Sequence, residues 1–219
     1  MIAVAIDGPA GAGKSTIART VAKKLGFIYV DTGALYRAIG YYCVSGGVDT
    51  KDPSAVGEVL SEIEVELKYE GGEQVVLLNG ENINGKIRTE EVSMAASNVS
   101  AIPAVRAFLL EMQRDMAKHN NVIMDGRDIA TVVLPDADVK IFLTASAEIR
   151  AKRRVLQLLE KGIEEDYEKV LAEVNKRDYN DAHREIAPLK PSADSVIIDT
   201  TYMTLQESVD RIYKTIIGR

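Results

Sequence analysis

The sequence predicts an α/β fold with a mainly parallel sheet of about five strands, because short apolar runs alternate with segments of helical periodicity. The chain has 219 residues, of which 46% are hydrophobic, and this suffices to bury one core with a modest insert. Sheets of this class bind ligands beyond the carboxyl ends of their strands. The candidate strands are residues 2–6, 27–30, 122–124, 139–143 and 196–198.

The first part of the chain alternates strand and helix. A glycine-rich turn follows the strand at 2–6, and apolar residues then recur at helical spacing over 15–25. The strand at 27–30 precedes a helical segment over 34–44, which a Gly-Gly pair closes. Asp52 suits a helix N-cap and the proline after it suits the first helical position, so we expect a short helix there.

Residues 63–87 have a different pattern. Val65, Leu67 and Tyr69 alternate with charged residues, and Asn79-Gly80 is a hairpin-type turn signal. We therefore expect a small antiparallel insert here.

The last part of the chain is helix-rich. An amphipathic helix is expected over 103–118, and two highly charged helices are expected over 146–162 and 166–183. Thr204-x-x-Glu207 is a capping box that opens a terminal helix.

Composition narrows the class of function. The net charge of −6 and the pI near 5.1 argue against nucleic-acid or membrane-surface binding, which needs a broad basic field, although a small anionic substrate needs only a few cations. Cys43 is the single cysteine, so neither an internal disulfide nor a cysteine-based metal site is expected. The start lacks a signal-peptide pattern, and no apolar run has transmembrane length. We expect a soluble cytoplasmic protein, and a monomer because no large apolar stripe is left over.

A phosphate-binding motif, G-x-x-x-x-G-K-[ST], lies between the first strand and the first helix, the context in which it functions. Its small residues let backbone N–H groups turn towards phosphate oxygens at a helix N-terminus, whereas the plain alternative is a turn that only joins strand to helix. Lys14 would reach the β- and γ-phosphates of ATP, and the Ser15 hydroxyl would ligate Mg²⁺. The predicted ATP-binding residues are Gly8, Pro9, Ala10, Gly11, Ala12, Gly13, Lys14, Ser15 and Thr16.

A second pattern, Asn175-Lys176-Arg177-Asp178, matches the N-K-x-D guanine-binding motif of GTPases. That motif should end a strand, but here it lies inside a charged helical stretch, and no D-x-x-G switch follows a strand. The GTPase interpretation is therefore disfavoured.

Three further segments are rich in residue types that commonly bind phosphates and sugars. They are DTGALYR at 31–37, DGRD at 125–128, and the group Arg177, Asp181 and Arg184. Each alone could be a turn, an N-cap or a solvated charge. Together with the phosphate loop, they favour a second, anionic substrate. Asp125 could hold Mg²⁺ through water, or it could cap the turn before Gly126.

The sequence resembles the bacterial cytidylate kinase family over essentially its whole length. The resemblance lies in IDGPAGAGKST, DTGALYR, the insert ending in GKIRTEEV, MDGRDIATVVLPDADVKIFL and RDYNDAHREIAPL. The insert distinguishes this family from shorter monophosphate kinases such as adenylate kinase. The resemblance implies a P-loop NTPase three-layer sandwich that uses ATP and Mg²⁺ to phosphorylate CMP and dCMP, with no general base because the attacking group is already a phosphate oxygen.

By the same resemblance, Arg37 and Arg127 would hold the CMP phosphate, and Arg184 would help there or at the transferring phosphoryl group. Ser97, Arg106 and Asp128 would read the base. Asp128 would accept from the cytosine 4-amino group and Arg106 would donate to its ring acceptors, contacts that uracil would reverse. Asp181 with Arg177 would bind the sugar. The implied acceptor site is Thr32, Tyr36, Arg37, Ser97, Arg106, Arg127, Asp128, Arg177, Asp181 and Arg184.

Lys and Arg fill four of the five positions at 150–154. They could form a solvated helix face, or they could belong to a lid over ATP. Arg153 and Arg154 are the best candidates to reach the phosphates. The expected catalytic residues are Lys14, Arg127, Arg184, Arg153 and Arg154, with Ser15 and Asp125 at the metal. The expected parts are a core at 1–62, 93–145 and 185–219, an insert on the CMP side near 63–92 and a lid near 146–184.

Two other functions fit the same residues. One is a P-loop kinase for UMP or another small acceptor, and the other is a nucleotide-binding switch or assembly ATPase without an acceptor. Arginines gathered at the strand ends argue against the second.

Overall fold

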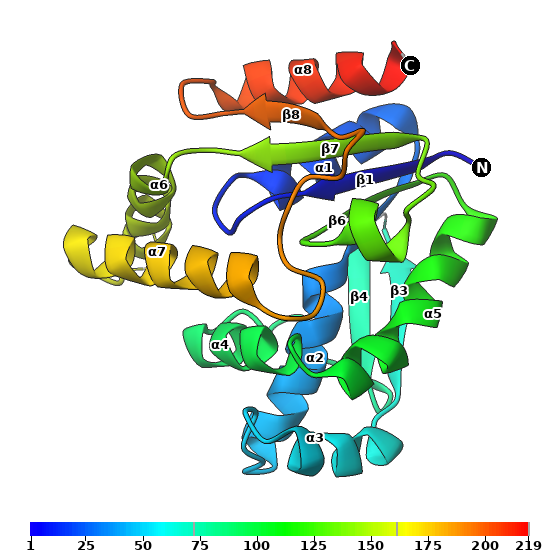
Figure 1. Cartoon of the computed structure of the whole chain (residues 1–219), viewed down its shortest axis with the longest axis vertical. Coiled ribbons are helices and arrows are strands. Elements are labelled where there is room, and N and C mark those ends of the chain that lie inside the picture. The colour runs from blue at the N-terminus through cyan, green and yellow to red at the C-terminus, as the bar shows by residue number, and fades with distance from the viewer. Residues whose placement is uncertain (72, 161, 219) are drawn as a thin grey trace.

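A computed structural model describes residues 1–71, 73–160 and 162–218. Its main sheet contains the five predicted strands, all parallel, in the order β2-β6-β1-β7-β8 (Figure 1). This order confirms the predicted parallel sheet and brings the P-loop strand β1 to its centre. The strands are β1 (Ala3–Asp7), β2 (Ile28–Asp31), β6 (Val122–Gly126), β7 (Val139–Thr144) and β8 (Val196–Asp199).

Helices cover both faces of this sheet, and the alternation of side chains along β1 separates the two cores. Val4 and Ile6 pack into one core with α1 (Lys14–Leu25) and α8 (Leu205–Ile217). Ala5 faces the opposite core, which includes the π-helical segment η2 (Ile129–Val133) and contacts from α5 (Pro103–His119). The predicted three-layer sandwich is therefore confirmed.

The second sheet is antiparallel and contains β3 (Val65–Glu70), β4 (Glu73–Leu78) and β5 (Glu81–Asn82). Asn79 and Gly80 join β4 to β5 with φ angles of 49° and 81°, as the hairpin signal predicts. This sheet shares a third core with α5 and three other helices. They are α2 (Thr32–Ser45), α3 (Pro53–Val59), which the 3₁₀ turn η1 (Leu60–Glu62) follows, and α4 (Glu90–Val99).

The helix α4 was not predicted from the sequence. Thr89 caps it by accepting from the Val92 N–H, and it packs closely on α2. A Cβ on Gly40 of α2 would lie 2.9 Å from the Ala96 nitrogen, so glycine permits this approach. The expected boundary near residue 92 falls inside this helix.

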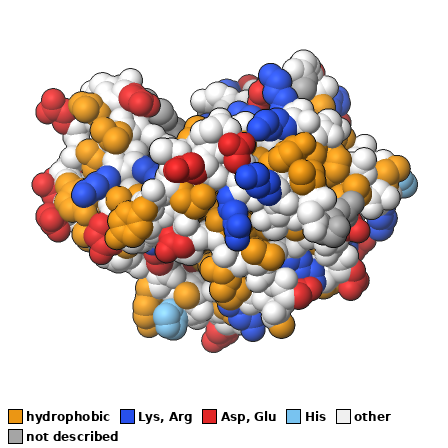
Figure 2. All heavy atoms as spheres, turned by 90° about the horizontal axis from the view of Figure 1, so that it is seen from above, with side chains coloured by type: hydrophobic (Ala, Val, Ile, Leu, Met, Phe, Trp, Pro, Cys, Tyr) orange, Lys and Arg blue, Asp and Glu red, His pale blue; other side chains and the backbone are white. Residues whose placement is uncertain are grey.

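Two charged helices, α6 (Ala147–Leu159) and α7 (Tyr167–His183), form an arm at the left of Figure 1. From above, the outline is notched between this arm and the rest of the molecule, and acidic and basic side chains intermingle on the visible face (Figure 2). Within the described ranges no single helix has the length and hydropathy of a membrane span; α4 and α5 reach them only as a pair bent by 97°.

Candidate active site

The P-loop has the backbone of a phosphate cradle. Gly8, Gly11 and Gly13 have φ angles of 148°, 77° and 92°, values that other residues rarely adopt. A Cβ on Gly8 would lie only 1.9 Å from the Leu143 carbonyl oxygen, so β7 leaves room for glycine alone. The loop then leads directly into α1, whose first residue is Lys14. Its N–H groups and the helix N-terminus are suited to bind an anion.

Lys14 is held inside the loop and is 6% exposed. Its Nζ donates to the Pro9 carbonyl at 2.9 Å. Burial, followed by the charge of Arg127, lowers the pKa of Lys14 to about 7, against the opposing effect of Asp125 and Asp7. A bound polyphosphate would stabilise the charged form of this amine.

Ser15 and Asp125 form the candidate metal site. The Ser15 hydroxyl donates to Asp125 at 2.7 Å, so two oxygen ligands lie side by side. Burial and the nearby Asp31 raise the pKa of Asp125 to about 6, and a cation would relieve both effects. Among the described residues no group of three His, Cys, Asp or Glu side chains is placed to hold a metal. The Ser15 and Asp125 oxygens suit Mg²⁺, a hard cation that takes few protein ligands and completes its shell with phosphates and water.

Asp7, at the end of β1, was not among the predicted site residues. It is 1% exposed, and its two carboxylate oxygens accept from the backbone N–H groups of Ile129 and Ala130, both at 2.8 Å. These bonds fix the start of η2 and hence the position of the preceding Asp128. Burial raises the pKa of Asp7 to about 6.

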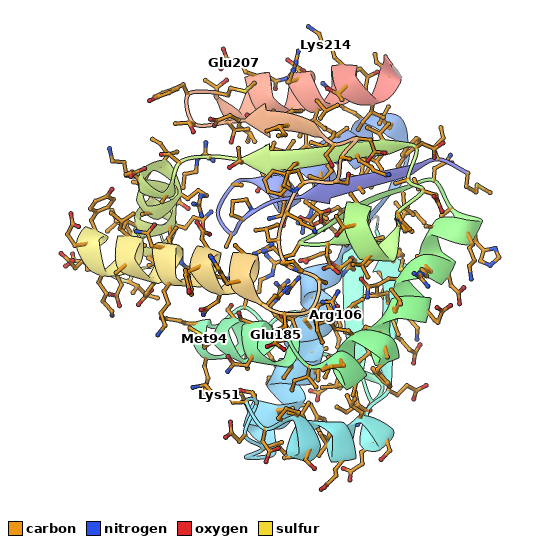
Figure 3. All side chains as sticks on the ribbon, in the orientation of Figure 1. Lys51, Met94, Arg106, Glu185, Glu207 and Lys214 are labelled. Carbon is orange, nitrogen blue, oxygen red and sulfur yellow. The ribbon has the colours of Figure 1, made fainter. Side chains whose placement is uncertain are left out.

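Asp128 is the centre of a buried charged cluster. It pairs with Arg106 of α5 and, at 3.5 Å, with Arg184, which follows α7. All three side chains are less than a tenth exposed. Tyr36 lies over this cluster, with its ring centroid 6.0 Å from the Arg106 guanidinium carbon. In Figure 3, Arg106 lies at the middle of the molecule beside the chain that follows α7, where Glu185 is labelled.

A second group of arginines lies around Arg127, whose charge acts on Lys14 of the P-loop and on Arg177. Arg127 pairs with Asp181 at 2.8 Å, and Arg37 pairs with Asp31 at 2.7 Å. Burial and the charge of Arg127 lower the pKa of Arg177 to about 10. The buried Nε–H groups of Arg37 and Arg177 have no hydrogen-bond partner in the described part of the chain. Unpaired donors of this kind indicate a missing acceptor such as phosphate.

Two other predicted residues lie at the edges of this group. Ser97 shares a cleft of about 470 Å³ with Asp181 and Arg184. Thr32 is 3% exposed, and its hydroxyl donates to the Asp125 carbonyl at 2.8 Å, so that this bond ties α2 to the end of β6.

On α6, the basic residues differ in burial and in the groups that they contact. Arg153 donates to the Thr200 carbonyl at 2.9 Å and lies near the Ala12 carbonyl, while Arg154 is half-buried. The side chain that is buried against the loop is Arg150, which was not singled out from the sequence. The run of basic residues was the only signal for it, and helical register decides which member faces inward.

Comparison with known proteins agrees with this geometry. The cytidylate kinase family matches residues 4–217. A cytidylate kinase of Caldicellulosiruptor saccharolyticus is 52% identical over 96% of this chain and 93% of its own, and one of Lactobacillus gasseri is 49% identical over 99% and 94%. A solved, uncharacterized protein from Eubacterium ventriosum has a TM-score of 0.54 at 14% identity, covers 100% of both chains and shows the fold alone. The chain belongs to the cytidylate kinase family.

Proposed function

We propose that this kinase transfers the γ-phosphoryl group of ATP to the phosphate of CMP or dCMP, giving ADP and CDP or dCDP. The observation that carries the proposal is the buried Asp128 cluster, in which a carboxylate and two guanidinium groups lie side by side. Together with membership of the cytidylate kinase family, this cluster favours cytosine as the base.

The chemistry of the cluster matches one edge of cytosine. Asp128 can accept from the 4-amino group, and Arg106 can donate to the N3 and O2 acceptors. Uracil presents a carbonyl and an N–H at the first two of these positions. Both contacts would then be unfavourable in a site that is closed to water, so UMP should be a poor acceptor.

The phosphoryl group would pass between two sets of cations. Lys14 and the P-loop would bind the donor phosphates, and Arg37 and Arg127 would hold the acceptor phosphate. Arg177, expected at the sugar, would join them because its buried Nε–H has no partner among the described residues, whereas Arg184 lies at Asp128. An acceptor phosphate oxygen forms the new bond to the γ-phosphorus as the bond to the β,γ-bridging oxygen of ATP breaks. No proton has to be removed, so the residues contribute by positioning the substrates and by neutralising the charge of the phosphate oxygens.

Ser15 and Asp125 are the residues that would hold Mg²⁺, whose charge would help to neutralise the phosphate oxygens. On the acceptor side, Asp181 would bind the sugar hydroxyls from the cleft that it shares with Ser97. The buried, unpaired Nε–H groups of Arg37 and Arg177 support the placement of the acceptor phosphate.

The division into parts is also proposed. The sheet β3–β5 and its flanking chain, near residues 63–92, would form the acceptor side, and residues 146–184 would form the lid. Gln74 supports the first assignment. Its amide oxygen accepts from the Asp31 N–H at 2.9 Å and its amide nitrogen donates to the Asp31 carbonyl at 3.3 Å, next to the ion pair between Arg37 and Asp31. A monomeric state and a cytoplasmic location remain predictions.

An acceptor panel tests the function. ADP formation from MgATP is measured with CMP, dCMP, UMP, AMP and GMP at equal concentrations. CMP and dCMP should be phosphorylated much faster than the other three. A preference for another nucleotide, or a rate of ATP consumption that no acceptor changes, would refute the proposal.

A further inference from the structure

The first turn of α6 lies against the outside of the P-loop. Arg150 in this turn is 4% exposed, and its Nη1 donates to the Ala10 carbonyl of the loop at 3.1 Å. Its Nε donates to the carbonyl of Ala145, directly after β7, at 2.8 Å. A Cβ on Gly11 would come within 3.2 Å of the Arg150 Cβ, so loop and helix are in direct contact.

The same guanidinium group also holds α7. Its two terminal nitrogens donate to the two carboxylate oxygens of Asp178 at 2.9 and 2.5 Å, a bidentate arrangement that fixes the plane of the arginine. The Arg150 side chain is 5% exposed and that of Asp178 is 29% exposed, so the pair is partly shielded from water. One arginine is thus bound to the P-loop, to the residue that follows β7 and to α7.

The loop requires such a donor. A P-loop turns its N–H groups towards the phosphates, so its carbonyl groups point outward and need hydrogen bonds there. Arg150 provides one for Ala10, and Thr200 approaches the Ala12 carbonyl at 3.4 Å. The Arg150 bond is the shorter of the two, and it comes from a charged donor.

Because Asp178 lies on α7, the link that Arg150 makes between the P-loop and Asp178 affects the acceptor side of the reaction as well. Arg177 precedes it directly and Asp181 follows it by three residues, so the pair joins the ATP loop to the helix that carries acceptor-binding residues. We infer that Arg150 and Asp178 are positioning residues. They hold the ATP site and the acceptor site at the distance and orientation that phosphoryl transfer requires. The part about the acceptor rests on the proposed function. Asp178, the last residue of the N-K-x-D pattern, thus has a structural role in this contact.

The test compares Asp178→Asn with Glu165→Gln. The second variant removes the ion pair between Glu165 and Lys169, 2.9 Å long, at the start of α7 and serves as the control. In Asp178→Asn, kcat with CMP should fall by about tenfold or more, because small displacements of reacting groups carry large rate penalties. Amide exchange of residues 8–15 in the nucleotide-free protein should become faster. Glu165→Gln should match the wild type in both measurements.

A second variant separates positioning from a loss of charge. Arg150→Lys keeps the charge but has no planar fork, so it cannot bond to Ala10, Ala145 and Asp178 together, and it should reproduce both changes. If both variants keep wild-type kcat and wild-type exchange of residues 8–15, the inference is wrong. It is also wrong if they only lower the melting temperature. Should the wild-type protein fail to phosphorylate CMP, the proposed function fails, whereas the exchange comparison still decides whether the link orders the loop.

Discussion

The substitution Asp128→Asn examines base recognition most closely. The amide retains the size of the carboxylate and one oxygen acceptor, but it removes the negative charge that faces Arg106 and Arg184. It also places an N–H₂ group where the cytosine 4-amino group would donate. The variant therefore changes the hydrogen-bonding pattern of the site with little change in its volume.

The size of the effect follows from burial. Asp128 is 4% exposed and Arg106 is 8% exposed, so water cannot replace the lost contact. A hydrogen bond to a charged group contributes about 1.5–3 kcal/mol, and a buried donor that is left without a partner adds a further cost. We expect kcat/KM for CMP to fall by about 2–4 kcal/mol, which is roughly 30- to 900-fold. The gap between CMP and UMP should narrow, because the amide can donate to the uracil O4.

The assay is coupled ADP formation over a range of CMP and UMP concentrations, with circular dichroism to verify folding. Asp115→Asn is the control: it removes an exposed ion pair to Lys118 on α5 and should leave kcat/KM unchanged. Unaltered CMP kinetics in Asp128→Asn would show that this carboxylate is structural, and the assignment of base recognition would then fail.

Three further predictions concern the donor, the insert and the buried acid of β1. Lys14→Ala should lower turnover on the order of 10³-fold while circular dichroism stays native, and near-normal turnover would remove the P-loop from the chemistry. Gln74→Ala, which breaks both bonds to Asp31, should raise KM for CMP and leave KM for ATP unchanged; an equal rise in both would contradict the acceptor-side role of the insert. The pKa of Asp7 is raised from 3.8 to about 6. As the pH rises through this interval, the unfolded chain therefore loses the proton before the folded chain does. The free energy of unfolding should fall by about 3 kcal/mol over the whole interval. Denaturant titrations at pH 4 and pH 6.5 should show most of this fall in the wild type relative to Asp7→Asn, and identical pH dependences would refute it.

Local sequence signals were sufficient to predict the strands of the main sheet and the P-loop. Each strand is a short apolar run that ends at polar or small residues, and each can be recognised from its own sequence. The capping box at Thr204 is present as predicted, because both of its bonds form within one helical turn. The helix α4 had local signals too, Thr89 followed by two glutamates, but it directly follows the insert and is only 10 residues long.

The contacts that arrange the site could not be predicted in this way. Asp7 reaches Ile129 across 122 residues, and Arg150 reaches Ala10 across 140. Such pairs depend on the order of strands in the sheet and on helical register, neither of which a local pattern fixes. The π-helical turn after Asp128 has the same origin, since the Asp7 carboxylate accepts the first two N–H groups of that turn.

A kinase of this family must transfer the phosphoryl group to a nucleotide rather than to water. Incubation with γ-labelled MgATP and CMP, followed by separation of CDP, ADP and inorganic phosphate, measures this directly. We expect one labelled CDP for each ADP formed, with little labelled inorganic phosphate. Label released chiefly as inorganic phosphate, at a rate that CMP does not change, would contradict it.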